Sequence, residues 1–232
     1  MALPPPTFSN RPSEEIIPPD SLIQETIEFV YNSLLPWSND DALKGKHTKP
    51  ERKLNGNLSD FLTISHRMIY FRHEQDEEEN SRSVDIAAKP RETVMVSGRS
   101  YNYSQPILLI EAKRLPAPTK DREREYVTGE NGEITGGIQR FKLGKHGKEH
   151  EKAIIVGYVQ EQTPKDWYPI INGWIDQLAN DAPVLWNPCE KLLNIQFSKC
   201  NGLAYSTSSH PRNTADCKSP TIQLHHFWIQ LN

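Results

Sequence analysis

Three residues in the middle of the chain have the types and the spacing that a hydrolytic metal site requires. Asp85 interrupts a short apolar stretch, and Glu111 directly follows the apolar run at residues 107–110. Lys113 comes two residues after Glu111, so on an extended strand both side chains project from the same face. An ionised carboxylate inside a sheet is costly unless it is paired or bound to a metal ion. We therefore expect the two carboxylates and the lysine to form one site.

Metal-assisted phosphodiester hydrolysis is the chemistry that suits this set. Mg²⁺ and Mn²⁺ prefer carboxylate oxygens, so Asp85 and Glu111 are the predicted ligands. Such an ion polarises a phosphodiester and lowers the pKa of a bound water. Lys113 can orient that water or neutralise charge on the phosphate. Two other acid-x-Lys triplets occur, at residues 51–53 and 216–218, but neither follows a buried strand preceded by an isolated aspartate.

Hydrophobic spacing predicts the elements that position these residues. A first helix begins near residue 20 or 21 and is expected to end at Pro36. A second helix is announced by Thr48 and Glu51, which form a capping-box pattern around Pro50. Strands are expected at residues 68–71, 84–88, 107–110 and 153–159, with a short helix opening near Gly136. The order helix, strand, strand, strand, helix, strand indicates an α/β (α+β) fold with a mixed sheet flanked by helices.

The remainder of the chain supplies an arm, a loop and an extension. Residues 1–20 contain six prolines and are predicted to form a flexible N-terminal arm. Residues 21–232 are expected to form a single domain, with its core at about 48–160 and an extension at about 161–232. The extension comprises a Trp-containing helix and three strands at residues 192–197, 203–207 and 221–229. The charged segment 116–135 is expected to be a mobile loop over one end of the sheet.

At this point the sequence resembles the PD-(D/E)xK nuclease superfamily, which has the restriction-endonuclease-like fold. The signature of that superfamily is an Asp on the second core strand and Glu-x-Lys on the third, matched here by Asp85 and by Glu111-Ala112-Lys113. The resemblance covers residues 48–160, about half of the chain. Val84 stands where the strict pattern has proline, and the long interval before Glu111 implies an inserted loop around residues 91–106.

The resemblance also implies roles for residues outside the signature. Members often carry an acidic residue on the first core helix, for which Glu51 is the candidate, and a Gln or Lys on the second, for which Gln139 is the candidate. The carbonyl of Ala112 is implied as a further metal ligand beside Asp85 and Glu111. A purely structural role stays open for both residues, because Glu51 is also explained by helix capping and Gln139 by a position on the helix surface.

A basic cluster follows Gln139 and is a candidate for phosphate contact. We expect Arg140, Lys142, Lys145 and His146 to bind nucleic acid, the alternative being a solvated helix face. The amides at the helix start near Gly136 and Gly137 are a further candidate phosphate site. His210, His225 and His226 lack the spacing of a closed metal-ligand set, which favours packing and surface roles.

Composition limits the biological setting. The net charge of −3 argues against a passive DNA-coating protein but not against an enzyme with a local basic surface. The apolar runs are too short to span a membrane, and the absence of a targeting segment together with only three cysteines favours a reducing cytoplasm. The lack of a Cys-x-x-Cys spacing gives little support for a zinc site. We expect DNA rather than RNA as substrate, in restriction or anti-phage defence, with a partner protein or a homodimer both compatible. The alternative is a catalytically inactive subunit that keeps the nuclease-like fold and binds nucleic acid.

Overall fold

The computed structural model describes residues 21–232 except 41–42, 44, 46–47, 77–82, 97, 131, 199–201, 213–214 and 216. The predicted arm at residues 1–20 therefore lies outside the described residues. The described residues contain no helix long and apolar enough to cross a membrane.

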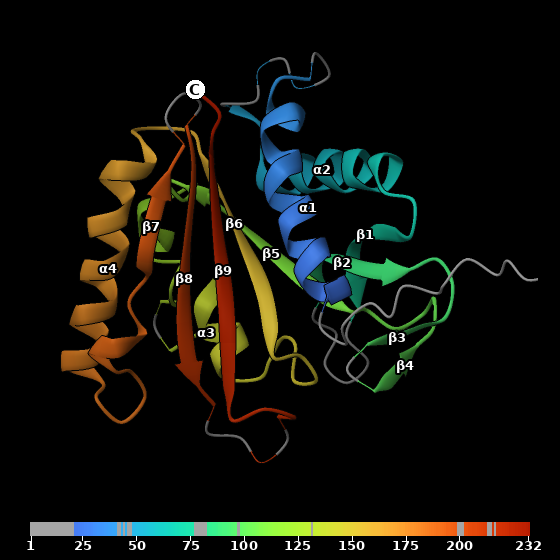
Figure 1. Cartoon of the computed structure of the whole chain (residues 1–232). Helices are drawn as coiled ribbons and strands as arrows, with labels where there is room; N and C mark the ends of the chain where they lie inside the picture. Colours follow the sequence, from blue (N-terminus) through green and yellow to red (C-terminus); the bar gives the residue numbers. More distant parts are fainter. Residues whose placement is uncertain are drawn as a thin grey trace, which may run out of the picture.

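A seven-stranded mixed sheet forms the centre of the molecule, in the order β1-β2-β5-β6-β9-β8-β7 (Figure 1). Its first four members in the chain are β1 (Ile69–Asp76), β2 (Ser83–Pro90), β5 (Leu108–Leu115) and β6 (Lys152–Val159). The extension adds β7 (Leu193–Phe197), β8 (Leu203–Pro211) and β9 (Thr221–Gln230). The pairs β5–β6 and β6–β9 are parallel, whereas the other neighbours are antiparallel. The mixed sheet predicted from the sequence is thus confirmed.

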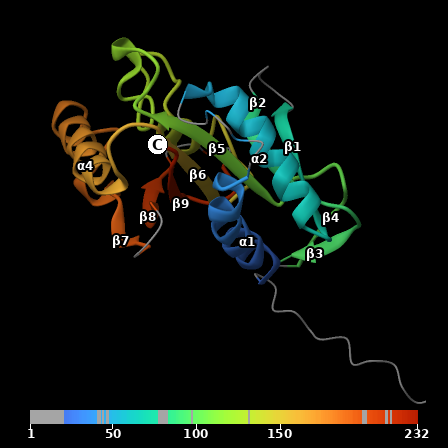
Figure 2. The same cartoon turned by 90° about the horizontal axis from the view of Figure 1, so that it is seen from above.

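Helices cover both faces of the sheet. Helices α1 (Ser21–Ser38) and α2 (Glu51–Ser65) lie side by side on one face (Figures 1 and 2). Helices α3 (Gly137–Lys142) and α4 (Pro164–Asp181) pack on the other face. Alternating strand residues feed the two layers: Ile110 and Ile154 point toward α1 and α2, and Leu109 and Ile155 point toward α3 and α4. The order α2, β1, β2, β5, α3, β6 is the one predicted.

Three local expectations were wrong. Helix α1 does not end at Pro36 but continues to Ser38, with Pro36 inside its last turn. The interval at residues 91–106 is not only a loop, because it contains the hairpin of β3 (Val94–Val96) and β4 (Arg99–Tyr101). The segment 116–135 is not a free loop either. It contains the short 3-10 helix η3 (Lys120–Arg122) and then buries Tyr126 and Val127 under α3.

Candidate functional site

The candidate site lies where β2 and β5 separate. Their pairing ends at Ile86 and Ile110, and Asp85 follows at the next position on β2. Instead of continuing the ladder, Asp85 Oδ2 accepts a hydrogen bond from the Ala112 amide at 2.8 Å. The Asp85 carboxylate therefore fills the gap between the strands and is held beside Glu111.

Glu111 and Lys113 face the α3 side of β5, as their spacing predicts. Leu109 and Leu115 on the same face belong to the α3–α4 layer. Lys113 Nζ lies 2.9 Å from Glu111 Oε1, and both side chains are buried. Gly137 packs directly over them, because a Cβ at this position would lie 3.6 Å from Lys113 Cγ and 3.8 Å from Glu111 Cγ. The backbone at the start of α3 thus covers the side chains of Glu111 and Lys113.

Glu51 belongs to the site and not to a capping box. Pro50 is the N-cap of α2 and makes no side-chain cap bond, while the Thr48 hydroxyl donates to the Gly45 carbonyl. Glu51 is therefore free to reach β5, where Oε2 accepts from the Arg114 amide at 3.1 Å and Oε1 lies 3.6 Å from Lys113 Nζ. The capping-box expectation was wrong because proline at the N-cap position displaces Thr48 from it.

Arg140 completes the group from α3. Its guanidinium Nη1 donates to Glu111 Oε1 at 2.9 Å and lies 3.5 Å from His146 Nε2. His146 is fully buried, with Nε2 3.7 Å from Glu111 Oε2. We call Glu51, Asp85, Glu111, Lys113 and Arg140 the acidic cluster. It joins α2, β2, β5 and α3, which are distant in the sequence.

The acidic cluster contains more negative than positive charge. Burial raises the pKa of Asp85 well above its usual range, and the neighbouring Glu111 adds to this rise. Burial likewise raises the pKa of Glu51. Burial alone would raise the pKa of Glu111 as well, but Lys113, His146 and Arg140 together lower it. Three basic groups thus hold Glu111 in its charged form, whereas burial outweighs the attraction of Lys113 for Asp85 and Glu51 and disfavours their charged forms.

The donors of the cluster suit a divalent cation. Glu111 Oε2 is buried without a hydrogen-bond partner in the described structure, which is a costly arrangement for a carboxylate oxygen. Asp85, held on the Ala112 amide directly beside Glu111, supplies a second carboxylate whose charged form a cation would stabilise. Within the described residues, no three His, Cys, Asp or Glu side chains lie close enough together to hold a metal ion. The predicted ligand set of Asp85, Glu111 and the Ala112 carbonyl requires only two such side chains.

Function must be inferred for this chain from its own residues. Comparison with models of known families, with curated proteins and with solved structures gave no match. The acidic cluster brings together buried carboxyl groups with shifted pKa values and an unpartnered carboxylate oxygen, and such sites are enriched in functional residues.

Several predicted residues lie elsewhere. Gln139 is buried, and its Oε1 accepts from the Gly129 amide at 3.0 Å, so this side chain stabilises the turn that precedes α3. Lys142 is buried and paired with Glu190 at 2.8 Å, so the structure does not place it where phosphate contact was expected. Lys145 is half-buried in the turn after α3. The basic cluster is therefore not one surface, because α3 directs Arg140 and Lys142 into two different ion pairs.

The amides that begin α3 are not available to a phosphate. Those of Gly137, Ile138 and Gln139 donate to the carbonyls of residues 125–127 at 2.9, 3.2 and 2.9 Å. Gly136 permits this close approach, since a Cβ there would meet the Thr128 backbone. The expectation of a phosphate site at this helix start was wrong because the turn at residues 125–128 occupies it.

Arg122 is a cation near the site that the sequence analysis did not identify. Its half-exposed side chain pairs with Glu125 at 2.6 Å, and Glu125 is the first cause that raises the pKa of Arg122. Glu51 contributes to the same rise, which places Arg122 within electrostatic reach of the acidic cluster. The sequence did not single out Arg122, because it lies in the charged segment 116–135, which was expected to be a mobile loop.

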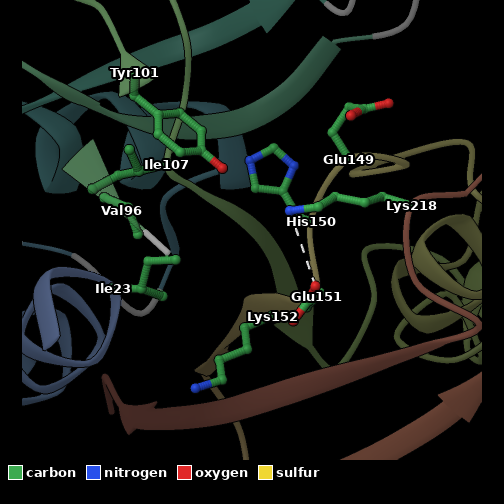
Figure 3. Close-up of a pocket in the computed structure, with 9 residues that line it drawn as sticks. All are labelled: Ile23, Val96, Tyr101, Ile107, Glu149, His150, Glu151, Lys152 and Lys218. Carbon is green, nitrogen blue, oxygen red and sulfur yellow. Dashed lines mark ion pairs between the residues drawn. The ribbon is translucent and has the colours of Figure 1, made fainter. Parts of the chain in front are cut away.

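A small cavity of about 60 Å³ lies at the opposite end of β5, beside Ile107 (Figure 3). Apolar side chains from Ile23 and Val96 face charged ones across it, among them Lys218 and Glu151, whose charged atoms are 4.0 Å apart. The cavity is separate from the acidic cluster, because none of the residues that line it belongs to that cluster.

Proposed function

We propose that the chain is a Mg²⁺- or Mn²⁺-dependent nuclease of the PD-(D/E)xK type, acting on DNA in preference to RNA. The observation that carries this proposal is the convergence of Asp85, Glu111 and Lys113, from two strands that separate at that point, into a buried cluster with excess negative charge. The fold supports it, because the helix and strand order around the cluster is the one that the resemblance implies.

Each residue of the acidic cluster has a role in this proposal. Asp85, Glu111 and the Ala112 carbonyl would hold the ion, which polarises the phosphodiester and activates water when bound. Lys113 keeps its proton, since Glu111 and Glu51 raise its pKa despite its burial. It can therefore donate to the attacking water or to the phosphate oxygens. Glu51 also pairs with Lys113, and the hydrogen bond from the Arg114 amide holds Glu51 in place.

Arg140 is the best-placed group for contact with the scissile phosphate. Its guanidinium already binds the oxygen of Glu111, and it is only partly buried. A guanidinium binds phosphate with two parallel hydrogen bonds, so an incoming phosphate can share or replace the bond to Glu111. Arg122 at the rim is a second cation for the backbone of the nucleic acid. Gln139 would act indirectly, through the turn that covers α3.

One observation favours the alternative of an inactive binding subunit. Lys113 and Arg140 both occupy Glu111 Oε1, so the carboxylate is already neutralised by the protein itself. A retired site would keep such a pairing, whereas it has no reason to keep Asp85, a carboxyl group whose burial raises its pKa well above the usual range. For this reason we favour the enzyme, and a partner protein or a second copy would then act on its specificity.

A cleavage assay tests the proposal. Linear, circular and single-stranded DNA and RNA would be incubated with the protein in Mg²⁺, Mn²⁺ or EDTA, beside Lys113→Ala and Asp85→Ala. We expect metal-dependent cleavage of DNA that both variants lose while they remain folded. Cleavage that survives both substitutions would exclude this site. Absence of cleavage on every substrate, together with absence of Mn²⁺ binding, would favour the inactive binding subunit.

A further inference from the structure

A buried chain of hydrogen bonds links the two ends of α3 through the C-terminal strands. From Lys142, the last residue of α3, Nζ donates to both oxygens of Glu190 at 2.8 Å. Glu190 Oε2 lies 2.7 Å from His210 Nδ1, and Ser208 Oγ lies 2.6 Å from His210 Nε2. We call this set the histidine chain, which continues through His226 and Tyr126 to Trp228.

The second half of the histidine chain ends under the start of α3. Ser208 Oγ lies 2.7 Å from His226 Nε2, and the Tyr126 hydroxyl lies 2.8 Å from His226 Nδ1. Trp228 Nε1 donates to the same hydroxyl at 2.8 Å. The Tyr126 carbonyl in turn accepts from the Ile138 amide. One chain of bonds therefore holds the first turn of α3 and also its last residue.

From Trp228 to Glu190 one order of donors satisfies every bond of the histidine chain, and the Glu190 carboxylate accepts at its end from His210 and, on the other side, from Lys142. Trp228 is donor only, so the Tyr126 hydroxyl accepts from it and donates to His226 Nδ1. His226 then carries its proton on Nε2 and donates to Ser208, whose hydroxyl donates to His210 Nε2. His210 carries its proton on Nδ1 and donates to Glu190. Burial lowers the pKa of both histidines, so each remains neutral with the tautomer that this order requires.

The strand extension also holds the turn that follows α3. Arg212, just after β8, donates from Nε to the Phe141 carbonyl at 3.2 Å and from Nη2 to the Gly147 carbonyl at 2.9 Å. Its Nη1 donates to the His150 carbonyl at 3.1 Å. His146, which lies against Glu111, is inside the segment so held. The extension thus fixes α3 and its exit turn, the two pieces that contact Glu111 from above.

We propose that Ser208, His210, His226 and Glu190 are positioning residues, which set α3 so that Arg140 meets Glu111. This proposal rests on the proposed function for its catalytic consequence, but its structural consequence is independent. It assigns the C-terminal strands a task beyond completing the sheet. α3 has six residues, too few to be stable as a helix alone, so its placement depends on such external bonds.

Ser208→Ala tests the proposal because it removes the link between the two histidines without adding volume. Ser206→Ala is the matched control. Ser206 lies on the same face of β8 and is equally buried, but its hydroxyl has no hydrogen-bond partner within the described structure. We expect amide hydrogen exchange of Arg140 and Leu143 to become about tenfold faster in Ser208→Ala than in Ser206→Ala, a local opening ahead of global unfolding. Equal exchange in the two variants would overturn the proposal.

Imidazole nitrogen resonances give a signature that a loss of packing alone does not give. In the wild type, we expect His226 to be protonated on Nε2 and His210 on Nδ1. In Ser208→Ala we expect His226 to populate the other tautomer, because its Nε2 loses the hydroxyl that accepts from it, while Glu190 still holds the proton of His210 on Nδ1. Unchanged tautomers in both histidines would overturn the directional order of the chain.

A double-mutant cycle with Arg140→Ala tests the catalytic consequence. We expect Ser208→Ala to lower kcat about tenfold at unchanged KM, in line with the sensitivity of catalysis to small misplacements. In an Arg140→Ala background the same substitution should cost nothing further. A full tenfold loss in that background would show that the chain does not act through Arg140. If the wild type does not cleave, the proposed function fails, and the exchange experiment still decides whether the histidine chain positions α3.

Discussion

The two buried polar clusters on either side of α3 have similar residue types but opposite charge balance. In the histidine chain the Glu190 carboxylate accepts from Lys142 and from His210, and each ring nitrogen of His210 and His226 has a partner. In the acidic cluster three carboxylates share two cations, and Glu111 Oε2 has no hydrogen-bond partner within the described residues. One cluster is satisfied, and the other is not.

This difference separates a structural network from a candidate reactive site. A fully satisfied buried network makes the fold rigid and specific, whereas unsatisfied charge costs stability and persists where function requires it. The pKa directions agree with this distinction, since Lys142 and His210 help lower the pKa of Glu190 while burial raises that of Asp85. Substitutions that affect the two clusters in opposite ways therefore test the account.

The largest expected effect is the loss of cleavage in Glu111→Gln. The substitution keeps the shape of the side chain but removes the charge that holds Lys113 and Arg140. We expect kcat to fall by about 10³-fold or more, because ion binding and the electrostatic arrangement are both affected. Retention of more than a tenth of the wild-type rate would contradict the assigned role. Circular dichroism and a urea titration check that the variant is folded.

The same substitution in the other cluster, Glu190→Gln, is expected to act mainly on stability. It leaves Lys142 buried beside a neutral amide. Breaking one partner of a buried pair costs about 3–5 kcal/mol in unfolding free energy. Urea denaturation of Glu190→Gln and Glu111→Gln should rank Glu190→Gln as the less stable variant. The reverse order would show that the acidic cluster is the main structural one.

Acid should destabilise the protein through the histidines of the C-terminal strands. Burial lowers the pKa of His225 to about 4, and it also lowers the pKa values of His210 and His226. In the unfolded chain these histidines are protonated below about pH 6.5, whereas in the folded protein they stay neutral to a lower pH. The unfolding free energy is therefore highest above about pH 6.5 and falls as the pH falls toward 4. His225→Gln should reduce the loss of unfolding free energy between pH 7 and 4 by about 2 kcal/mol. An unchanged loss would show that His225 titrates normally.

The smallest expected effect is a gain in stability from Asp85→Asn. The amide oxygen can still accept from the Ala112 amide, while the repulsion by Glu111 and Glu51 disappears. In EDTA we expect the unfolding free energy to rise by about 1 kcal/mol, the size of one unit of pKa. Asp176→Asn is the control, since the ion pair of Asp176 with Lys191 is largely exposed and should contribute less than about 1 kcal/mol. A lower unfolding free energy for Asp85→Asn than for the wild type would contradict the proposal that Glu111 and Glu51 repel Asp85 in the acidic cluster.

The sequence predicted the centre of the candidate site because its signals are local. An apolar run ends at Glu111, and Lys113 follows at strand spacing, so both the strand and the shared face could be inferred. The sequence left two roles open for Glu51, because Thr48 offered a local capping explanation, which Pro50 at the N-cap position excludes in the structure. The convergence on the Asp85 side chain needed the register of β2 on β5, which only the fold supplies.

The histidine chain was beyond sequence reasoning for a physical reason. Its members come from the turn after η3 and from α3, η4 (Pro188–Glu190), β8 and β9, and no two of them show a metal or catalytic spacing. His210 and His226 were interpreted as packing or surface residues, and in the structure both are buried and hydrogen-bonded. Lys142 was assigned to nucleic acid because a six-residue helix is too short for its faces to be distinguished by periodicity.

Binding of Mn²⁺ tests the central claim most directly, because it requires no knowledge of the substrate. The paramagnetic resonance signal of free Mn²⁺ would be titrated with wild type, Asp85→Asn, Glu111→Gln and the control Asp176→Asn. The account predicts saturable binding by the wild type and by Asp176→Asn, with affinity reduced at least tenfold in the other two variants. A wild type that leaves Mn²⁺ free at millimolar concentration, or equal binding by all four proteins, would contradict it.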